Sequence, residues 1–351
     1  MRGRSNFSVS LGLLVLAFLA CLSGCASGGL GLGEISDAPI ALVYWDEADA
    51  RKRADLMANL TGRPQDQNRL GVAHIDAVAS LIGAGQEAPV SQQLARYPGR
   101  IVLLNARTLE KTRLEAAPPN ARPLAWSEDR SRLLFNSDHL DGGIGQIYEY
   151  DFGTQEVRKL THGPAYHLEG DYGLRGEVLV NWVSLREAQG KAGMDIRSES
   201  GAQLINLMEG QFPVAPGWSP TEDLIVYGQA DESGGARDQS LILVREAKPG
   251  GDAQPLGRGR DAVFTPDGRW IVFSSQGPRG WRLQRMRPDG SARKALGQSV
   301  LSARSPAISP DGKHVAYVSN EGGFDRLYVR RMDGSGDRIL LGEGSVAFPA
   351  W

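Results

Sequence analysis

The chain has 351 residues, with 39 lysines and arginines against 41 aspartates and glutamates, so its formal net charge is −2. This balance offers no broad electrostatic attraction to nucleic acid, and we expect no nucleic-acid partner. A chain of this length can bury a large hydrophobic core, so its stability can come from that core instead of from cross-links.

The N-terminus has the pattern of an export signal. Arg2 and Arg4 precede an apolar run over residues 11–20, and small residues follow up to Cys25. This pattern predicts a signal peptide over residues 1–24. The apolar run is about half of the roughly 20 residues that cross a bilayer, so it is too short to span as an anchor.

The sequence Leu22-Ser23-Gly24-Cys25 resembles the lipobox of bacterial lipoproteins. The resemblance implies that the Cys25 thiol is lipidated and that the mature chain begins there; ordinary cleavage without a lipid is the alternative. Ala26 after the cysteine resembles outer-membrane sorting, so we expect an outer-membrane lipoprotein on the periplasmic side. Cys21, the other cysteine of the chain, is then lost with the signal, which leaves no disulfide. The glycine-rich residues 25–37 are predicted to form a flexible tether.

A sequence motif of eleven residues recurs through the second half of the chain. Clear copies occupy 217–227, 263–273 and 307–317, and a weaker copy occupies 125–135. The residue before the serine or threonine of each copy serves as a marker. The four markers are Trp126, Trp218, Phe264 and Ile308, separated by 92, 46 and 44 residues, so the first gap holds two units. A period of this length is typical of propellers and related repeat folds.

Each unit is predicted to contain four strands. Two β-rich runs flank a turn such as Pro266-Asp267-Gly268, in which proline presets φ and glycine accepts a conformation that other residues avoid. A second hairpin follows, for example 326–332 paired with 338–341. Four strands in about 44 residues form one propeller blade.

The two ends of the chain together supply one further blade. The C-terminal residues Phe348-Pro349-Ala350-Trp351 match an opening strand, and residues 40–45, 100–105 and 111–114 match the remaining three strands. We therefore predict an all-β, six-bladed β-propeller over residues 38–351, closed by the pairing of its C-terminal strand with the N-terminal blade. An open stack of seven units is the alternative. The other five blades are expected at about 123–163, 165–208, 213–257, 260–297 and 305–342.

Insertions are expected between the second and third strands of the blades, and all of them leave the same rim. The largest is 46–99 in blade 1, with helices predicted over 47–60 and 75–82. Variable loops on a rigid scaffold commonly carry recognition, so this rim is the expected binding surface. Its candidate residues are Asp138, His139, Asp141, Arg186, Arg237, Arg279, Trp281 and Phe324.

The turn Ser309-Pro310-Asp311-Gly312 resembles the repeat of TolB-type propellers, a WD40-like group, and the likeness covers nearly the whole mature chain. The resemblance implies a periplasmic protein that contacts an envelope protein or a peptidoglycan-associated partner. Two features depart from the family pattern: no α/β domain is expected before the propeller, and the chain has a lipobox.

Catalytic patterns are sparse in this sequence. It has no Gly-x-Ser-x-Gly elbow, and its five histidines show no metal-ligand spacing. Asp138 and Asp141 beside His139 could hold calcium, but an ordinary polar loop is the preferred interpretation. We therefore expect no catalytic residue, no metal and no cofactor, and we favour a monomeric, lipid-anchored binding scaffold. The alternative is a propeller enzyme, a glycan lyase or hydrolase or a peptidase relative, acting in the central funnel, where Glu169 and Asp261 are the nearest acids.

Overall fold

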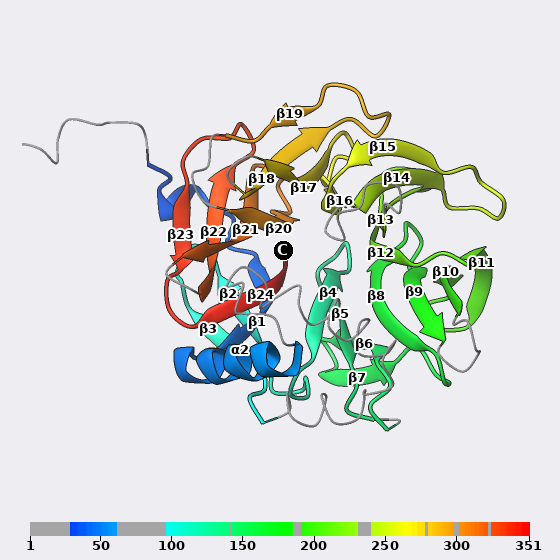
Figure 1. The fold of residues 1–351 in the computed structure, drawn as a ribbon, viewed down its shortest axis with the longest axis horizontal. Coiled ribbons are helices and arrows are strands. Elements are labelled where there is room, and N and C mark those ends of the chain that lie inside the picture. The colour runs from blue at the N-terminus through cyan, green and yellow to red at the C-terminus, as the bar shows by residue number, and fades with distance from the viewer. Residues whose placement is uncertain are drawn as a thin grey trace, which may run out of the picture.

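The computed structural model describes residues 29–61, 96–140, 142–184, 191–230, 240–277, 280–297, 302–321 and 324–351. Within these ranges the chain forms six four-stranded antiparallel sheets, arranged as blades around a central axis (Figure 1). No helix in the described ranges has the length and apolarity needed to cross a membrane. The predicted signal peptide and Cys25 lie outside the described residues.

The blades are numbered in chain order, and the strands of each are given from the innermost to the outermost. Blade 1 contains β24 (Ser345–Ala350), β1 (Pro39–Trp45), β2 (Arg100–Asn105) and β3 (Lys111–Arg113). Blade 2 contains β4 (Arg122–Trp126), β5 (Arg132–Ser137), β6 (Gln146–Asp151) and β7 (Glu156–Lys159). Blade 3 contains β8 (Tyr166–Tyr172), β9 (Val178–Ser184), β10 (Lys191–Arg197) and β11 (Gln203–Glu209).

The second half of the ring is built in the same way. Blade 4 contains β12 (Pro213–Trp218), β13 (Leu224–Ala230), β14 (Ser240–Glu246) and β15 (Gln254–Arg258). Blade 5 contains β16 (Arg260–Phe264), β17 (Ile271–Gly277), β18 (Gly280–Met286) and β19 (Lys294–Ala295). Blade 6 contains β20 (Ala303–Ile308), β21 (His314–Glu321), β22 (Phe324–Arg331) and β23 (Arg338–Leu341).

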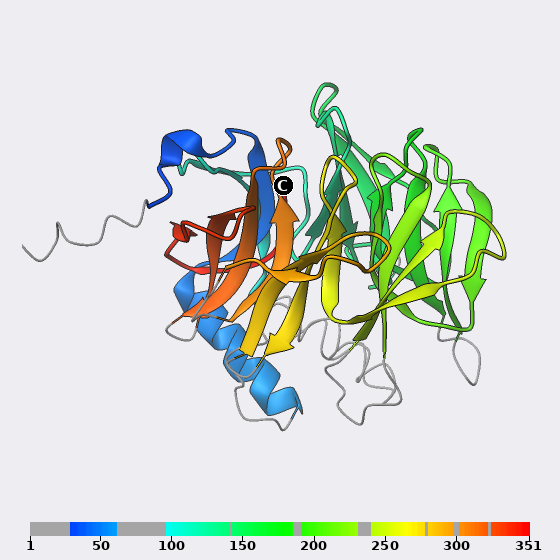
Figure 2. The same ribbon diagram turned by 90° about the horizontal axis from the view of Figure 1, so that it is seen from above.

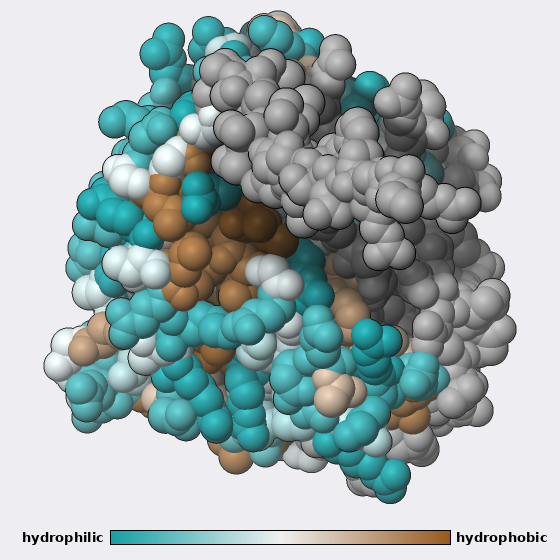
Figure 3. All heavy atoms as spheres, turned by 90° about the vertical axis from the view of Figure 1, so that its left-hand side faces the viewer, coloured by the Kyte–Doolittle hydropathy of each residue, from teal (hydrophilic) through white to brown (hydrophobic). Residues whose placement is uncertain are grey.

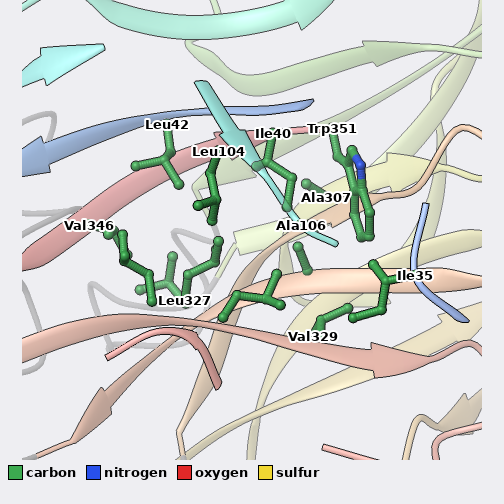
Figure 4. Packing of buried hydrophobic residues seen from close by; sticks show 14 of the residues in the cluster. Ile35, Ile40, Leu42, Leu104, Ala106, Ala307, Leu327, Val329, Val346 and Trp351 are labelled. Carbon is green, nitrogen blue, oxygen red and sulfur yellow. The ribbon is translucent and has the colours of Figure 1, made fainter. Parts of the chain in front are cut away.

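The ring is closed by the two ends of the chain, as the sequence predicted. Strand β24 pairs antiparallel with β1, with Val43 opposite Ala347 and Tyr44 opposite Val346. The core at this junction joins blades 1 and 6, and Leu42, Leu104 and Val346 lie in it with Leu327, Val329 and Trp351 (Figure 4). This pairing confirms the six-bladed propeller and excludes the open stack of seven units.

The recurring turn between the first two strands is fixed by its aspartate. In blade 6, Asp311 Oδ1 accepts hydrogen bonds from Ser309 Oγ at 2.6 Å and from the Lys313 amide at 3.1 Å. Gly312 has a φ of 68°, which explains the glycine of the repeat. Blade 3 lacks this aspartate, and there Glu177 Oε2 accepts the Arg175 amide at 2.8 Å instead. A local carboxylate therefore also holds the turn of blade 3, which lacks the Ser-Pro-Asp-Gly sequence of the repeat.

Helix α2 (Glu47–Thr61) follows β1, close to the predicted range of 47–60. Asp46 caps it, because its Oδ1 accepts the Asp49 amide at 2.9 Å. The helix lies at one edge of the disc, where its residues Ala50 and Arg53 are buried (Figure 2). The second predicted helix, at 75–82, lies outside the described residues.

The prediction of a flexible tether does not hold for residues 29–37. Leu30 is 2% exposed and Ile35 is fully buried, and both belong to the core between blades 1 and 6. The short 3-10 helix η1 (Leu32–Glu34) lies between them. Arg338 donates to the Leu30 carbonyl at 3.0 Å, which anchors the segment to β23. On the side of the disc that is at the left of Figure 1, the described residues are mostly hydrophilic, and the main hydrophobic area lies near the middle of the view (Figure 3).

Candidate binding rim

The alternation of strand direction divides the connections between two rims. In a four-stranded antiparallel blade, the loops between second and third strands share one rim with the connections to the next blade. We call this the loop rim; it is where β5, β9, β13 and β17 end, at Ser137, Ser184, Ala230 and Gly277. Helix α2 begins there, after β1. The Pro-Asp-Gly type of turn lies on the opposite rim, which we call the turn rim.

Each innermost strand contains a register shift relative to the second strand of its blade. In four blades the shift includes a non-glycine residue with positive φ, namely Ala215, Asp261, Ser305 and Phe348. A bulge turns a backbone amide out of the ladder, and that amide then needs another acceptor.

Carboxylates of neighbouring blades supply some of these acceptors. Glu169 Oε2 of blade 3 accepts the Ala215 amide of blade 4 at 2.6 Å. Asp171 Oδ2, also in blade 3, accepts the Trp218 amide at 2.8 Å, and Asp261 Oδ2 of blade 5 accepts the Ser305 amide of blade 6 at 3.2 Å. These acids therefore join adjacent blades near the axis.

Burial governs the ionisation of two of these acids. Desolvation raises the pKa of Glu169, although the nearby Arg122 opposes the shift. Desolvation also raises the pKa of Asp171, to about 6. The sequence indicated Glu169 and Asp261 as acids near the axis, but not Asp171. Side chains two residues apart lie on the same face of a strand, so Asp171 could have been placed beside Glu169.

Two of the predicted rim residues lie together at the end of β5. Asp138 is half-buried, and its pKa is raised by desolvation while Arg122 and Arg53 act in the opposite direction. His139 is exposed, with its Nδ1 2.9 Å from Ser137 Oγ and its ring 5.0 Å from that of Tyr148. This pair presents an acid and an imidazole on the loop rim.

Trp281 and Phe324 have different surroundings. Trp281 is half-buried and lines a pocket between blades 4 and 5. Phe324 is 7% exposed and packs with Val43, Trp45 and Ala50, so it attaches helix α2 instead of forming open surface. The remaining predicted residues, Asp141, Arg186, Arg237 and Arg279, lie outside the described residues.

His167 is buried at the start of blade 3 and is 2% exposed. Its Nε2 lies 3.1 Å from an Arg197 nitrogen and its Nδ1 lies 3.1 Å from Gln146 Oε1. Because a guanidinium only donates, Nε2 accepts and Nδ1–H donates to Gln146. Desolvation, reinforced by the charge of Arg197, lowers the pKa of His167 to about 3.

The pKa of His167 predicts a loss of stability in acid. The unfolded chain, with a histidine pKa near 6.5, binds more protons than the folded chain between pH 3 and 6.5, so stability from this residue falls as the pH drops through that window. At about 1.4 kcal/mol per pH unit, the loss from pH 7 to pH 5 is about 2 kcal/mol.

The His167→Gln variant should lose about 2 kcal/mol less than the natural protein over the same pH interval, measured by urea unfolding at both pH values. Asp171 acts in the opposite direction in both proteins, because its raised pKa favours the folded state in acid, so its effect cancels in the comparison. Identical pH dependence in the two proteins would contradict the role of His167.

Among the described residues, no group of three or more histidine, cysteine, aspartate or glutamate side chains is arranged to hold a metal ion. The axial carboxylates each use an oxygen to accept a backbone amide of the next blade. This use is typical of structural carboxylates. The geometry therefore assigns them to the scaffold and leaves the loop rim as the candidate binding surface.

Six four-stranded blades, closed by the C-terminal strand, form a six-bladed β-propeller, and its Ser-Pro-Asp-Gly turn is similar to that of TolB-type propellers. The family model described as the lipoprotein LpqB β-propeller domain matches residues 290–351. The crystal structure of TolB from Acinetobacter baumannii superposes with a TM-score of 0.61 at 14% identity, covering 95% of this chain and 70% of that one.

Two sequence relatives extend this likeness. The uncharacterized protein Atu1656 of Agrobacterium fabrum is 27% identical over 289 residues, which cover 76% of this chain and 94% of that protein. The Tol-Pal system protein TolB of Hydrogenovibrio crunogenus is 34% identical over 69 residues, but these cover 20% of this chain and 16% of that protein. The similarity to TolB is thus established for the fold.

Proposed function

We propose that the protein is a lipid-anchored scaffold of the cell envelope that binds a partner protein on its loop rim. The partner is an envelope or peptidoglycan-associated protein, and the propeller acts as a monomer without a cofactor. The anchor is a lipid on Cys25, on the periplasmic side of the outer membrane. The similarity of residues 290–351 to a lipoprotein propeller and of the fold to TolB supports this location.

The distribution of exposed groups between the two rims carries the proposal. On the turn rim, the aspartates in the short turns of blades 5 and 6 are occupied locally, because Asp267 and Asp311 accept hydrogen bonds from Thr265 and Ser309. The loop rim holds helix α2 and exposed side chains such as His139, Leu140 and Arg282. A rigid ring with its variable segments on one rim is suited to recognition by that rim.

The enzyme alternative receives no support from the axial acids. A glycosidase needs two carboxylates poised on either side of the scissile bond. Glu169, Asp171 and Asp261 instead accept backbone amides of the neighbouring blade. We therefore assign the protein to binding and not to catalysis.

Site-specific cross-linking in the native envelope tests the proposal. A photoreactive benzoylphenylalanine in place of His139, on the loop rim, should form a cross-link to an envelope protein that mass spectrometry identifies. The matched control carries the same group in place of Arg269, which is exposed on the turn rim, and should form none. Equal cross-linking at both positions, or at Arg269 alone, would contradict a partner on the loop rim.

This design avoids deleting the insertion 46–99, because that deletion would also remove helix α2. Arg53 of this helix packs over the Trp45 ring, with 5.3 Å between the guanidinium carbon and the ring centroid, and Ala50 packs against Phe324. A deletion would therefore expose core residues and mix a folding defect with a loss of binding.

A further inference from the structure

The pocket that includes Trp281 lies between blades 4 and 5 and has a volume of about 300 Å³. Its walls come from both blades, and Ser240, Ser275 and Trp281 lie near the loop-rim ends of their strands. Its lining residues are Ser240, Arg258, Gly259, Ser275, Gln276, Trp281, Arg282, Gln284 and Arg293. Neither blade forms this pocket alone.

The lining is strongly cationic. The described lining residues comprise three arginines, two carboxamides and two hydroxyls, and none of these described residues is a carboxylate. Arg282 and Arg293 form no ion pair with a carboxylate in the described part of the chain. The pKa of Arg293 is lowered by desolvation and by the positive charge of Arg282. The two guanidinium groups thus lie close enough to repel each other, and an anion between the walls would relieve that repulsion.

One buried hydroxyl borders the pocket. Ser275 is 5% exposed, and its Oγ has no hydrogen-bond partner among the described residues. A buried hydroxyl without a partner is uncommon, because the unmade hydrogen bond costs about 1–3 kcal/mol. Because less than 1 Å² of this oxygen is exposed, it lies behind the surface of the pocket wall.

The cationic wall is also held in place before any ligand arrives. Arg293 Nε donates to Gln284 Oε1 at 2.6 Å, and a terminal nitrogen of Arg293 donates to the Arg258 carbonyl at 2.8 Å. Its guanidinium lies 4.7 Å from the centroid of the Phe273 ring. A side chain fixed in this way loses little conformational freedom on binding an anion.

We propose that this pocket binds an acidic side chain of the partner protein, held by the arginines and flanked by Trp281. The proposal rests on the proposed function, because it names the chemistry by which the loop rim recognises its partner. The volume is at the lower end of the range for small-molecule pockets, about 300–1,000 Å³, and suits a side chain that projects from a protein surface. Carboxylates are the natural complement of guanidinium groups.

The test is calorimetric titration of the purified propeller with a hexaglutamate peptide, with hexaglutamine as the neutral peptide control. The natural protein should bind hexaglutamate and not hexaglutamine. Arg282→Gln should weaken this binding about tenfold, the effect of losing one charged hydrogen-bond partner. Arg282 is exposed, so its replacement leaves the core intact. Arg269→Gln makes the same charge change on the turn rim and should leave the affinity unchanged.

Inorganic phosphate, added as a competitor, distinguishes a carboxylate side chain from free phosphate as the anion that the pocket binds. Displacement of hexaglutamate by phosphate would support a common anion site in the pocket. Binding of phosphate without binding of hexaglutamate would overturn the acidic side chain as the occupant. Equal weakening by Arg269→Gln and Arg282→Gln, or no binding of either anion, would overturn the pocket as the site. These results are independent of cross-linking at position 139, so the pocket can fail while the loop rim still captures a partner.

Discussion

Replacing Trp351 with alanine is expected to lower the free energy of unfolding by about 3–5 kcal/mol, the usual cost of truncating a buried tryptophan. Trp351 is 9% exposed in the core that joins blades 1 and 6, and its Nε1 donates to the Ala38 carbonyl at 2.9 Å. The variant thus loosens the contact by which the end of the chain closes the ring. Urea unfolding followed by circular dichroism measures the loss.

The control for this variant is Leu204→Ala. Leu204 is a large hydrophobic residue on β11 that is 56% exposed, so its truncation should change the free energy of unfolding by less than about 0.5 kcal/mol. If Trp351→Ala were no more destabilising than Leu204→Ala, packing of the C-terminus would not contribute to closure.

The second large effect is expected at the ion pair of Arg304 and Asp325 in blade 6. Arg304 on β20 is 4% exposed, Asp325 on β22 is fully buried, and their side chains are hydrogen-bonded. Arg304→Leu should cost about 3–5 kcal/mol, because it leaves a buried aspartate without its cation. Asp325→Leu should have a similar cost, since it leaves the guanidinium unpaired.

The double variant Arg304→Leu, Asp325→Leu should be markedly more stable than either single variant, because it removes both charges and leaves an apolar pair. Urea unfolding of the four proteins completes a double-mutant cycle, which isolates the coupling between the two side chains. Strictly additive losses would show that the two charges do not stabilise each other.

Much of the fold could be predicted from the sequence, because the patterns that specify a blade involve residues close together in the chain. The markers Trp218, Phe264 and Ile308 recur at intervals of 46 and 44 residues, and each lies at the end of an innermost strand. The third strand of blade 1 was predicted at 100–105, and β2 occupies those residues. Turn chemistry and a period of two act between near neighbours in the chain, so they can be recognised without a structure.

Less of the candidate site could be predicted, because its residues come from different blades. The sequence placed Trp281 on the loop rim, but only the structure shows that Arg258 and Arg293 join it in one pocket. It also placed Phe324 on that rim without indicating that helix α2 would cover it.

The sequence by itself determined the number of blades, their boundaries and the shared first blade, because repeat length and turn residues are properties of consecutive residues. The tertiary structure decided which backbone groups the charged side chains bind. Asp261 reaches the Ser305 amide of the next blade across 44 residues, and Arg338 holds Leu30 across 308 residues. Such contacts depend on how the blades pack around the axis, and no local pattern in the chain encodes that geometry.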